Sequence, residues 1–462
     1  MNYRLFFICA ALSLFACGCA AQQRPAGQGL ADPVYPPIVI PADKPPAQGV
    51  AGLTVTTAAT GMVEQLTLAD ALSLAIRHNP TLAAFAEEIR ARDAAALQAG
   101  LPPNPDLDLE LENFGGQDEL QDLEGAETTI ALSQLIELGG KRSKRRQVAS
   151  LEKELAGWDY RSSKLDVLAA TARSFIQVLA AQQQVALNQE LVSLAEKTQA
   201  AVGERVEAGK VSPLENSRVQ VELAAARSEA NRAQRELAAA RLRLGAAWGM
   251  APVKFDRVVG DLAAVQPLPP AETVQDLLAD NPDLLRWQSE RERHEAALAL
   301  ASSQALPDLS LKVGVRNFQD TDSNALMVGI QVPLPFFNRN QGGVAEARAK
   351  LRKSRELQQA AEAELRTGLG ETWQMLTAAY VEAVTIRDQI LPGAQEAYEA
   401  TAFGYREGKF DLLEMLDSQR TLFTVKRQYL QALETYHLAQ TELQRFTGAA
   451  EQAAGISASE NN

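Results

Sequence analysis

Apolar residues recur at alternating steps of three and four positions along two very long segments of the chain. This spacing is typical of helices that pack against other helices. The first segment runs from about Lys141 to Ala208 and the second from about Gly342 to Tyr405. A continuous helix of some 65 residues would be roughly 100 Å long, so each must lie against equally long neighbours. A Leu-Pro-Gly run at 391–393 interrupts the second segment and predicts a kink or a break there.

Four shorter segments alternate apolar and polar residues, which predicts β-strands with one apolar face. They form two hairpins, at about 107–138 and 309–332, and each strand has about the ten residues that a tilted strand needs to cross a bilayer. An ordinary sheet packed on helices in water would show the same alternation. Four strands cannot close a barrel, and open sheet edges are not tolerated in lipid. Membrane-spanning strands would therefore require oligomerisation, with eight strands from two copies or twelve from three.

The two halves of the chain repeat each other about 200 residues apart, which indicates internal duplication into one pseudo-symmetric unit. Gly209-Lys210 matches Gly408-Lys409, and Asn79-Pro80 matches Asn281-Pro282. The expected organisation is a signal peptide (1–16), a lipidated N-terminus with a Pro/Ala-rich tether (17–61), a first repeat of helices and a β-hairpin (62–255), a linker (256–270), a second such repeat (271–448) and a disordered tail (449–462).

The N-terminus and the composition indicate an exported protein. Tyr3 and Arg4 precede an apolar run too short to span a bilayer, as in a secretory signal. Cys17 ends a Leu-Phe-Ala-Cys sequence that resembles a bacterial lipobox, with Cys19 as the alternative lipidation site; both could instead be plain signal-peptide residues. All three cysteines lie in or beside this signal, so no disulfide or thiolate metal site is expected in the exported body. A net charge of -13 argues against a nucleic-acid partner.

Two segments where a strand passes into a long helix carry a family resemblance, Ser133 to Arg142 and Val332 to Gly343. They resemble the TolC-like outer-membrane efflux family, and specifically its heavy-metal branch that serves cobalt-zinc-cadmium exporters. The resemblance implies a mainly α-helical protein with a transmembrane β-barrel portion, built as a homotrimer with a shared twelve-stranded barrel and a long periplasmic helical tunnel. It also implies a passive conduit for divalent metal cations, without cofactor or catalysis, docked to an inner-membrane RND proton-driven pump through a periplasmic adaptor.

The two Gly-Lys turns are expected to join long helices at the closed periplasmic tip. Ser212 with Glu215, and Asp411 with Glu414, have the spacing of a capping box, so helix capping is one interpretation of both glutamates.

The family resemblance gives the second repeat a further role. It implies that Glu414 and Asp417, three residues apart on one helix face, form acidic rings that narrow the periplasmic entrance and favour cations. It also implies that Tyr405 ties the closed state and places Glu215 at the same aperture. Phe410 stands where a basic partner would be expected, so that salt link is not expected here.

The polar faces of the strands are candidates for the barrel lumen. They carry Asp108, Glu110 and Glu112 in the first hairpin and the opposite charges Lys312 and Arg316 in the second; solvation of an exposed surface would be the simpler interpretation. The three histidines are scattered without metal-ligand spacing, so the subunit is not expected to select the metal.

Three other functions fit part of this pattern. An outer-membrane channel for drugs or organic solutes would share every feature except the heavy-metal motifs. A periplasmic coiled-coil adaptor or structural lipoprotein would share the signal, tether and heptads but would not need two amphipathic hairpins. An exported hydrolase is disfavoured, because neither a Gly-x-Ser-x-Gly elbow nor a His-Glu-x-x-His pair occurs.

Overall fold

The computed structural model describes residues 63–117, 123, 125–249, 255–268, 270, 274, 276, 278–279 and 281–448. The expected signal peptide, both candidate lipidation sites, the tether and the tail lie outside the described residues. No helix in the described part is both long and apolar enough to cross a membrane.

The first repeat consists of helices with one β-hairpin between them. Its elements are β1 (Val63–Leu66), α2 (Leu68–His78), α3 (Pro80–Ala99), β2 (Asp106–Glu112), β3 (Glu127–Ile136), α4 (Lys141–Glu207) and α5 (Pro213–Ala246). The expected long helix is confirmed, because α4 runs for 67 residues without interruption. Its apolar seam includes Phe175, Val178 and Leu179, which are buried in the largest core cluster together with residues of α5 and of the second repeat.

The second repeat follows the order of the first with a modified long helix, and its described residues contain no counterpart of α2. Its elements are β4 (Phe255–Val258), α7 (Pro282–Ser303), β5 (Leu309–Phe318), β6 (Ser323–Gln331), α8 (Gln341–Thr385), the π-helical segment η2 (Ile386–Ile390), α9 (Leu391–Arg406) and α10 (Leu412–Thr447). The predicted interruption near Pro392 takes the form of η2, since the Leu391 N–H bonds the Ile386 carbonyl before α9 continues. A wider π turn accommodates a proline that lacks the N–H of an α-helical ladder.

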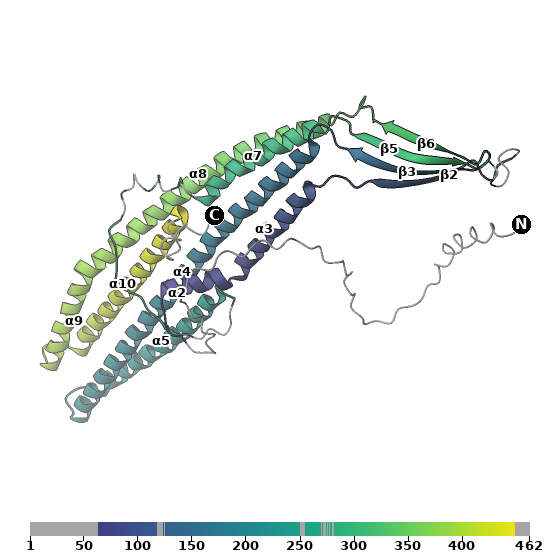
Figure 1. Ribbon diagram of the computed structural model, residues 1–462. Helices are drawn as coiled ribbons and strands as arrows, with labels where there is room; N and C mark the ends of the chain where they lie inside the picture. The colour runs from purple at the N-terminus through teal and green to yellow at the C-terminus, as the bar shows by residue number, and fades with distance from the viewer. Residues whose placement is uncertain are drawn as a thin grey trace, which may run out of the picture. The chain divides into compact units, whose positions relative to one another are not determined.

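The helices form a layer whose middle members change partway along α4. Beside the sheet, α4 packs between α3 and α7, and α7 packs on α8; farther from the sheet, α4 packs between α5 and α10, and α10 packs on α8 and α9 (Figure 1). Thus α3 is followed along the layer by α5, and α7 by α10. The long elements α4 and α8–α9 run past both junctions.

An asparagine joins helix ends at each of these junctions. Asn79 Oδ1 accepts from two backbone N–H groups at the start of α3 (2.8 and 3.2 Å), and its Nδ2 donates to the Ala247 carbonyl at the end of α5 (2.6 Å). Asn281 Oδ1 accepts from an N–H at the start of α7 (2.7 Å), and its Nδ2 donates to the Phe446 carbonyl in the last turn of α10 (2.8 Å). Each amide therefore satisfies unpaired groups at two helix ends. The repeated Asn-Pro sequence marks these junctions.

The four long strands form one antiparallel sheet in the order β2-β3-β5-β6. The two hairpins meet at β3 and β5, so β2 and β6 are the edges. Strand β3 ends before Leu138, whose N–H is bound by the Asp308 carboxylate (2.9 Å) rather than by a neighbouring strand. Gly314 sits at the centre, where a Cβ would overlap the backbone and side chain of β3. The sequence did not predict a separate parallel pair, β1 with β4.

Candidate functional site: the sheet faces, the tip and a charged hollow

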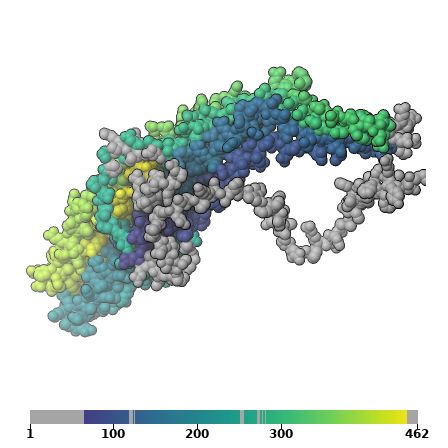
Figure 2. All heavy atoms as spheres, viewed as in Figure 1, coloured from purple at the N-terminus to yellow at the C-terminus, as the bar shows by residue number. Residues whose placement is uncertain are grey.

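One face of the sheet is apolar and bare. Ten of its side chains are between 44 % and 86 % exposed: Leu107, Leu109, Leu111, Ile130, Leu132, Val313, Val315, Leu326, Val328 and Ile330. In the view of Figure 2 no helix covers the sheet. A contiguous apolar surface of this extent marks a binding surface for protein or membrane. The period-two prediction of one apolar face is confirmed across all four strands.

The other face carries all five predicted lumen residues and joins them in an ion-pair ladder. Lys312 Nζ lies 3.3 Å from Asp108 and 4.0 Å from Glu110, while Arg316 lies 3.2 Å from Glu112. The strand register explains this, because β3 separates β2 from β5 with the small side chain of Ala131 and the short one of Thr129. The two cations thus bridge over β3 to the carboxylates of β2.

Glu127 was missed as a member of this face. It lies 2.8 Å from Arg316, and Asp106 shares the same face by register. Five carboxylates therefore stand against two cations on this surface, which leaves it acidic. A lumen lined by such a face would attract cations.

Side chains of the sequence motif at 133–142 connect the end of the sheet to the start of α4 by hydrogen bonds. Lys141 Nζ donates to Asp308 Oδ1 (2.7 Å) and to the Leu306 carbonyl (2.6 Å). Arg145 donates to both carboxylate oxygens of Glu137 (2.6 and 3.1 Å). The hydrogen bonds from Arg145 lower the pKa of Glu137, against a smaller opposing effect of burial. These contacts fix the direction in which α4 leaves β3.

At the tip, the two turns use glycines with a left-handed backbone, Gly209 (φ 65°) and Gly408 (φ 70°). The second repeat forms the complete capping box: the Glu414 N–H donates to Asp411 Oδ1 (2.9 Å), and the Asp411 N–H donates to Glu414 Oε2 (3.1 Å). The capping interpretation of Glu414 is therefore confirmed. In the first repeat only Ser212 caps, by accepting from the Leu214 N–H (3.3 Å).

Glu215 takes no part in capping α5 and lies beside the phenol of Tyr405 in α9. Tyr405 is 7 % exposed, and the Arg205 guanidinium carbon stands 4.6 Å from the centre of its ring. Arg205 also donates to the Tyr405 carbonyl (3.3 Å). Burial raises the pKa of the Tyr405 phenol, and the neighbouring Glu215 raises it further while Arg205 lowers it. The phenol oxygen and Glu215 Oε2 are buried without a well-formed hydrogen bond in the described part of the chain, so the ring, more than the hydroxyl, connects α9 to α4.

The structure brings Glu414 and Asp417 together on one exposed face of α10. Both side chains are exposed, whereas Met415 and Leu416 between them are buried in the tip cluster with Tyr405. Phe410 does not reach across the tip, because its ring packs against Gly404 at a place where any Cβ would overlap it.

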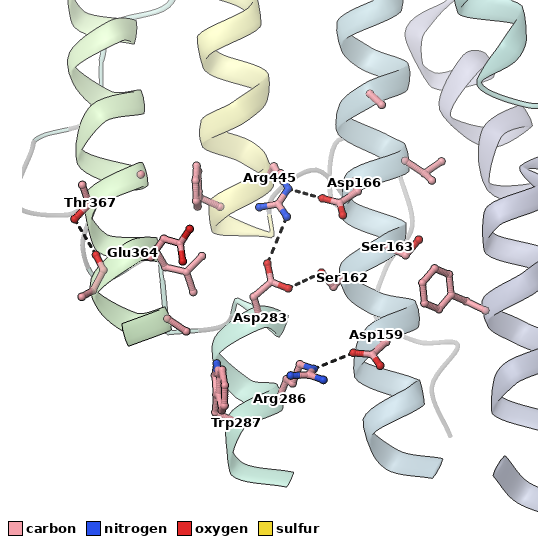
Figure 3. A pocket seen from close by; sticks show the side chains of 18 of the residues that line it. Asp159, Ser162, Ser163, Asp166, Asp283, Arg286, Trp287, Glu364, Thr367 and Arg445 are labelled. Atoms are coloured by element: carbon pink, nitrogen blue, oxygen red, sulfur yellow. Dashed lines mark hydrogen bonds and ion pairs between the residues drawn. The ribbon is translucent and has the colours of Figure 1, made fainter. Parts of the chain in front are cut away.

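A charged hollow of about 1430 Å³ lies beside the junction of α7 and α10. Figure 3 shows Arg445 of α10 between Asp166 of α4 and Asp283 of α7, at 2.6 and 3.5 Å. Arg286 pairs with Asp159 at 2.9 Å. Sequence reasoning missed this hollow, because its lining comes from five helices far apart in the chain; the repeated Asn-Pro sequence was the only local signal. No group of side chains in the described residues could hold a metal ion.

A family model described as "Outer membrane efflux protein" matches residues 71–250 and 273–449. The chain is 33 % identical over 383 residues to the cobalt-zinc-cadmium resistance protein CzcC of Cupriavidus metallidurans, covering 83 % of this chain and 90 % of the relative. It is 28 % identical to the nickel-cobalt-cadmium resistance protein NccC of Alcaligenes xylosoxydans xylosoxydans, covering 65 % and 68 %. It is 23 % identical to the pyoverdine export outer membrane protein OpmQ of Pseudomonas aeruginosa, covering 77 % and 79 %.

Two solved structures share the fold at low identity. CusC superposes with a TM-score of 0.69 at 17 % identity, covering 82 % of this chain and 91 % of that one. The outer membrane protein VceC of Vibrio cholerae superposes with a TM-score of 0.68 at 17 % identity, covering 82 % and 96 %.

Proposed function

Because this chain belongs to the outer membrane efflux protein family, we propose that it is the trimeric outer-membrane channel of a tripartite exporter for divalent heavy-metal cations. Family membership makes it an efflux protein of the outer membrane, a passive conduit and not an enzyme. One observation carries the channel proposal: a four-stranded sheet with an apolar face, an acidic face and two open edges.

The open edges support the trimer. A lipid-exposed edge leaves N–H and C=O groups unpaired, which costs several kcal/mol per group. Pairing β6 of one protomer with β2 of the next removes every edge when the ring closes, and three copies give twelve strands. The bare leucines, isoleucines and valines then face lipid, while the ladder of Lys312 and Arg316 faces the lumen.

The partners proposed are a periplasmic adaptor and an inner-membrane RND pump driven by protons. Their support is the similarity to metal-resistance proteins, over 83 % of the chain for CzcC and 65 % for NccC, together with the passive character of the conduit. Lipidation of Cys17, or alternatively Cys19, remains a prediction from the sequence, and it would anchor the N-terminus in the same membrane.

Divalent cations are the proposed cargo because relatives and electrostatics agree. CzcC and NccC are resistance proteins for cobalt, zinc, cadmium and nickel. The sheet face is acidic, and the hollow adds Asp159, Asp166, Asp283, Glu364 and Glu371 against two arginines. The similarity to OpmQ favours organic solutes as the second candidate cargo.

At the tip we assign the exposed pair Glu414 and Asp417 to the cation-selective aperture, with Glu215 at the same aperture, and the buried ring of Tyr405 against Arg205 to the contact that holds it closed. Three copies of the pair would place six carboxylates around a three-fold axis. The support is their exposure on one helix face beyond the buried cluster.

The test is the double variant Glu414→Gln with Asp417→Asn, because glutamine preserves the capping hydrogen bond and both changes preserve side-chain shape. We expect the cation preference of the channel in a bilayer to fall. The charge-retaining swap Glu414→Asp with Asp417→Glu is the matched control and should keep it. Unchanged selectivity in the neutral variant would remove this pair from the aperture.

A further inference from the structure

The loop between β6 and α8 presents large apolar side chains to solvent. In this collar loop, residues 332–340, Leu334 is 69 % exposed, Phe336 is 70 % exposed and Phe337 is 93 % exposed. Apolar side chains of this size rarely stand together in water unless they form an interface.

The collar loop has a defined internal structure. The Phe336 N–H donates to the Leu334 carbonyl (2.9 Å), and Arg339 Nε donates to the Pro335 carbonyl (3.2 Å). Asn340 adopts a left-handed backbone (φ 55°), and its Nδ2 donates to the Ala301 carbonyl of α7 (2.8 Å). The backbone that carries the two rings is therefore ordered by hydrogen bonds before and after them.

The collar loop lies at one edge of the sheet and at the same edge of the helical layer. It connects β6, an edge strand, to α8, which ends the helical order α3-α4-α7-α8 on the same side (Figure 1). The opposite edge is formed by β2 and α3. These two elements are joined by residues 100–105. Leu97, near the end of α3, is 70 % exposed, and Leu101, in the joining segment, is 47 % exposed.

Strand direction brings these two edges to the same level in a ring. Neighbouring strands in the sheet are antiparallel, so β6 of one copy would pair antiparallel with β2 of the next. Strand β6 ends where it returns to the helices, and β2 begins where it leaves them. The residues after β6 in one copy therefore lie beside the residues before β2 in the next.

We propose that the collar loop is a contact between copies: Phe336 and Phe337 of one protomer pack against Leu97 and Leu101 of the next, where the sheet meets the helices. This inference rests on the trimer proposed above. The collar loop would then close the contact between neighbouring copies at the level where the strands end and the helices begin. A contact of this kind is head-to-tail, because it joins two different surfaces, and it forms a closed ring when the rotation between successive copies closes.

The test uses engineered cysteine pairs in the full chain, whose native cysteines are Cys9, Cys17 and Cys19. Phe337→Cys combined with Leu101→Cys, or with Leu97→Cys, is purified in detergent and treated with a short bismaleimide. We expect conversion of most of the monomer band into covalent dimers and trimers. Each single variant, and Phe337→Cys paired with Leu214→Cys at the distant tip, should remain monomeric on the gel.

Two results would overturn the proposal. One is an intact trimer, shown by its mass and its conductance, in which neither pair crosslinks. The other is Phe337→Trp fluorescence that brominated lipids quench strongly, which would assign the rings to the membrane interface. A chain that is monomeric in detergent and silent in a bilayer would instead overturn the trimer itself, so the two failures are distinguishable.

Discussion

Asn281 allows a direct test of how the end of α10 is joined to the start of α7. The side chain is fully buried and makes two hydrogen bonds to different helices, at 2.7 Å to α7 and 2.8 Å to α10. Asn281→Ala removes both. Asn281→Asp keeps an oxygen to cap α7, since asparagine and aspartate are equally good N-caps, but it replaces the amide donor with a carboxylate oxygen facing the Phe446 carbonyl.

The magnitude follows from the two bonds. Loss of an N-cap costs about 1 kcal/mol. Leaving the part-buried Phe446 carbonyl without a donor costs about 1–3 kcal/mol more. Asn281→Ala should therefore lower the local opening free energy by about 2–4 kcal/mol, or roughly a hundredfold in the opening equilibrium at 1.4 kcal/mol per factor of ten. Asn281→Asp should lose at least the second contribution.

Amide hydrogen exchange of the detergent-purified protein reads the two helix ends separately. In Asn281→Asp we expect faster exchange in the last turns of α10, while the start of α7 keeps its protection. Asn79→Asp is the matched variant at the first junction and should loosen the end of α5 in the same way. If Asn281→Asp exchanges like the wild type while Asn281→Ala loosens only α7, the residue is an ordinary N-cap and the junction argument is wrong.

Contacts in the sheet, at the start of α4 and at the tip can each be tested by substitution. Gly314→Val should prevent assembly of the sheet, because its Cβ would overlap β3; a trimer of normal thermal stability would contradict this, and Gly329→Val, where a Cβ has room, is the control. The pKa of Glu137 is lowered in the folded protein from its ordinary value of 4.5, so ionised Glu137 stabilises the fold above pH 4.5. That stabilisation is lost as the pH falls through the lower folded pKa. In a plot of melting temperature against pH, Glu137→Gln should therefore fall less steeply in acid than the wild type; parallel plots would refute this. Arg205→Ala should raise conductance by loosening the tip, since the cation–π contact contributes about 0.5–2 kcal/mol, while Tyr405→Phe should change it little; the reverse order would show that the hydroxyl holds the tip.

The periodic elements could be predicted from the sequence because their signal is local. Period-two alternation at 107–112 and 326–332 identified the sheet and its two faces, and heptad spacing identified α4 over nearly its full length. The Gly-Lys turns and the Asp411–Glu414 cap could also be predicted, because the hydrogen bonds and backbone angles involved lie within a few residues of one another. The placement of the lumen residues on one face also needed only the alternation.

The contacts that fasten these elements could not be predicted in the same way. Lys141 and Asp308 are 167 residues apart, and the sequence around each of them does not indicate that they pair. Glu215 has the spacing of a cap, yet tertiary packing places it beside Tyr405. The strand β4 is too short for periodicity to distinguish it from a linker.

The conductance of the purified protein in a planar bilayer, with a salt gradient to read ion selectivity, shows whether this chain forms a cation-selective channel. We expect discrete channels from a trimer, with a reversal potential that shows preference for cations. Anion preference would contradict the assignment of an acidic lumen and aperture. A monomer that never conducts would contradict the channel.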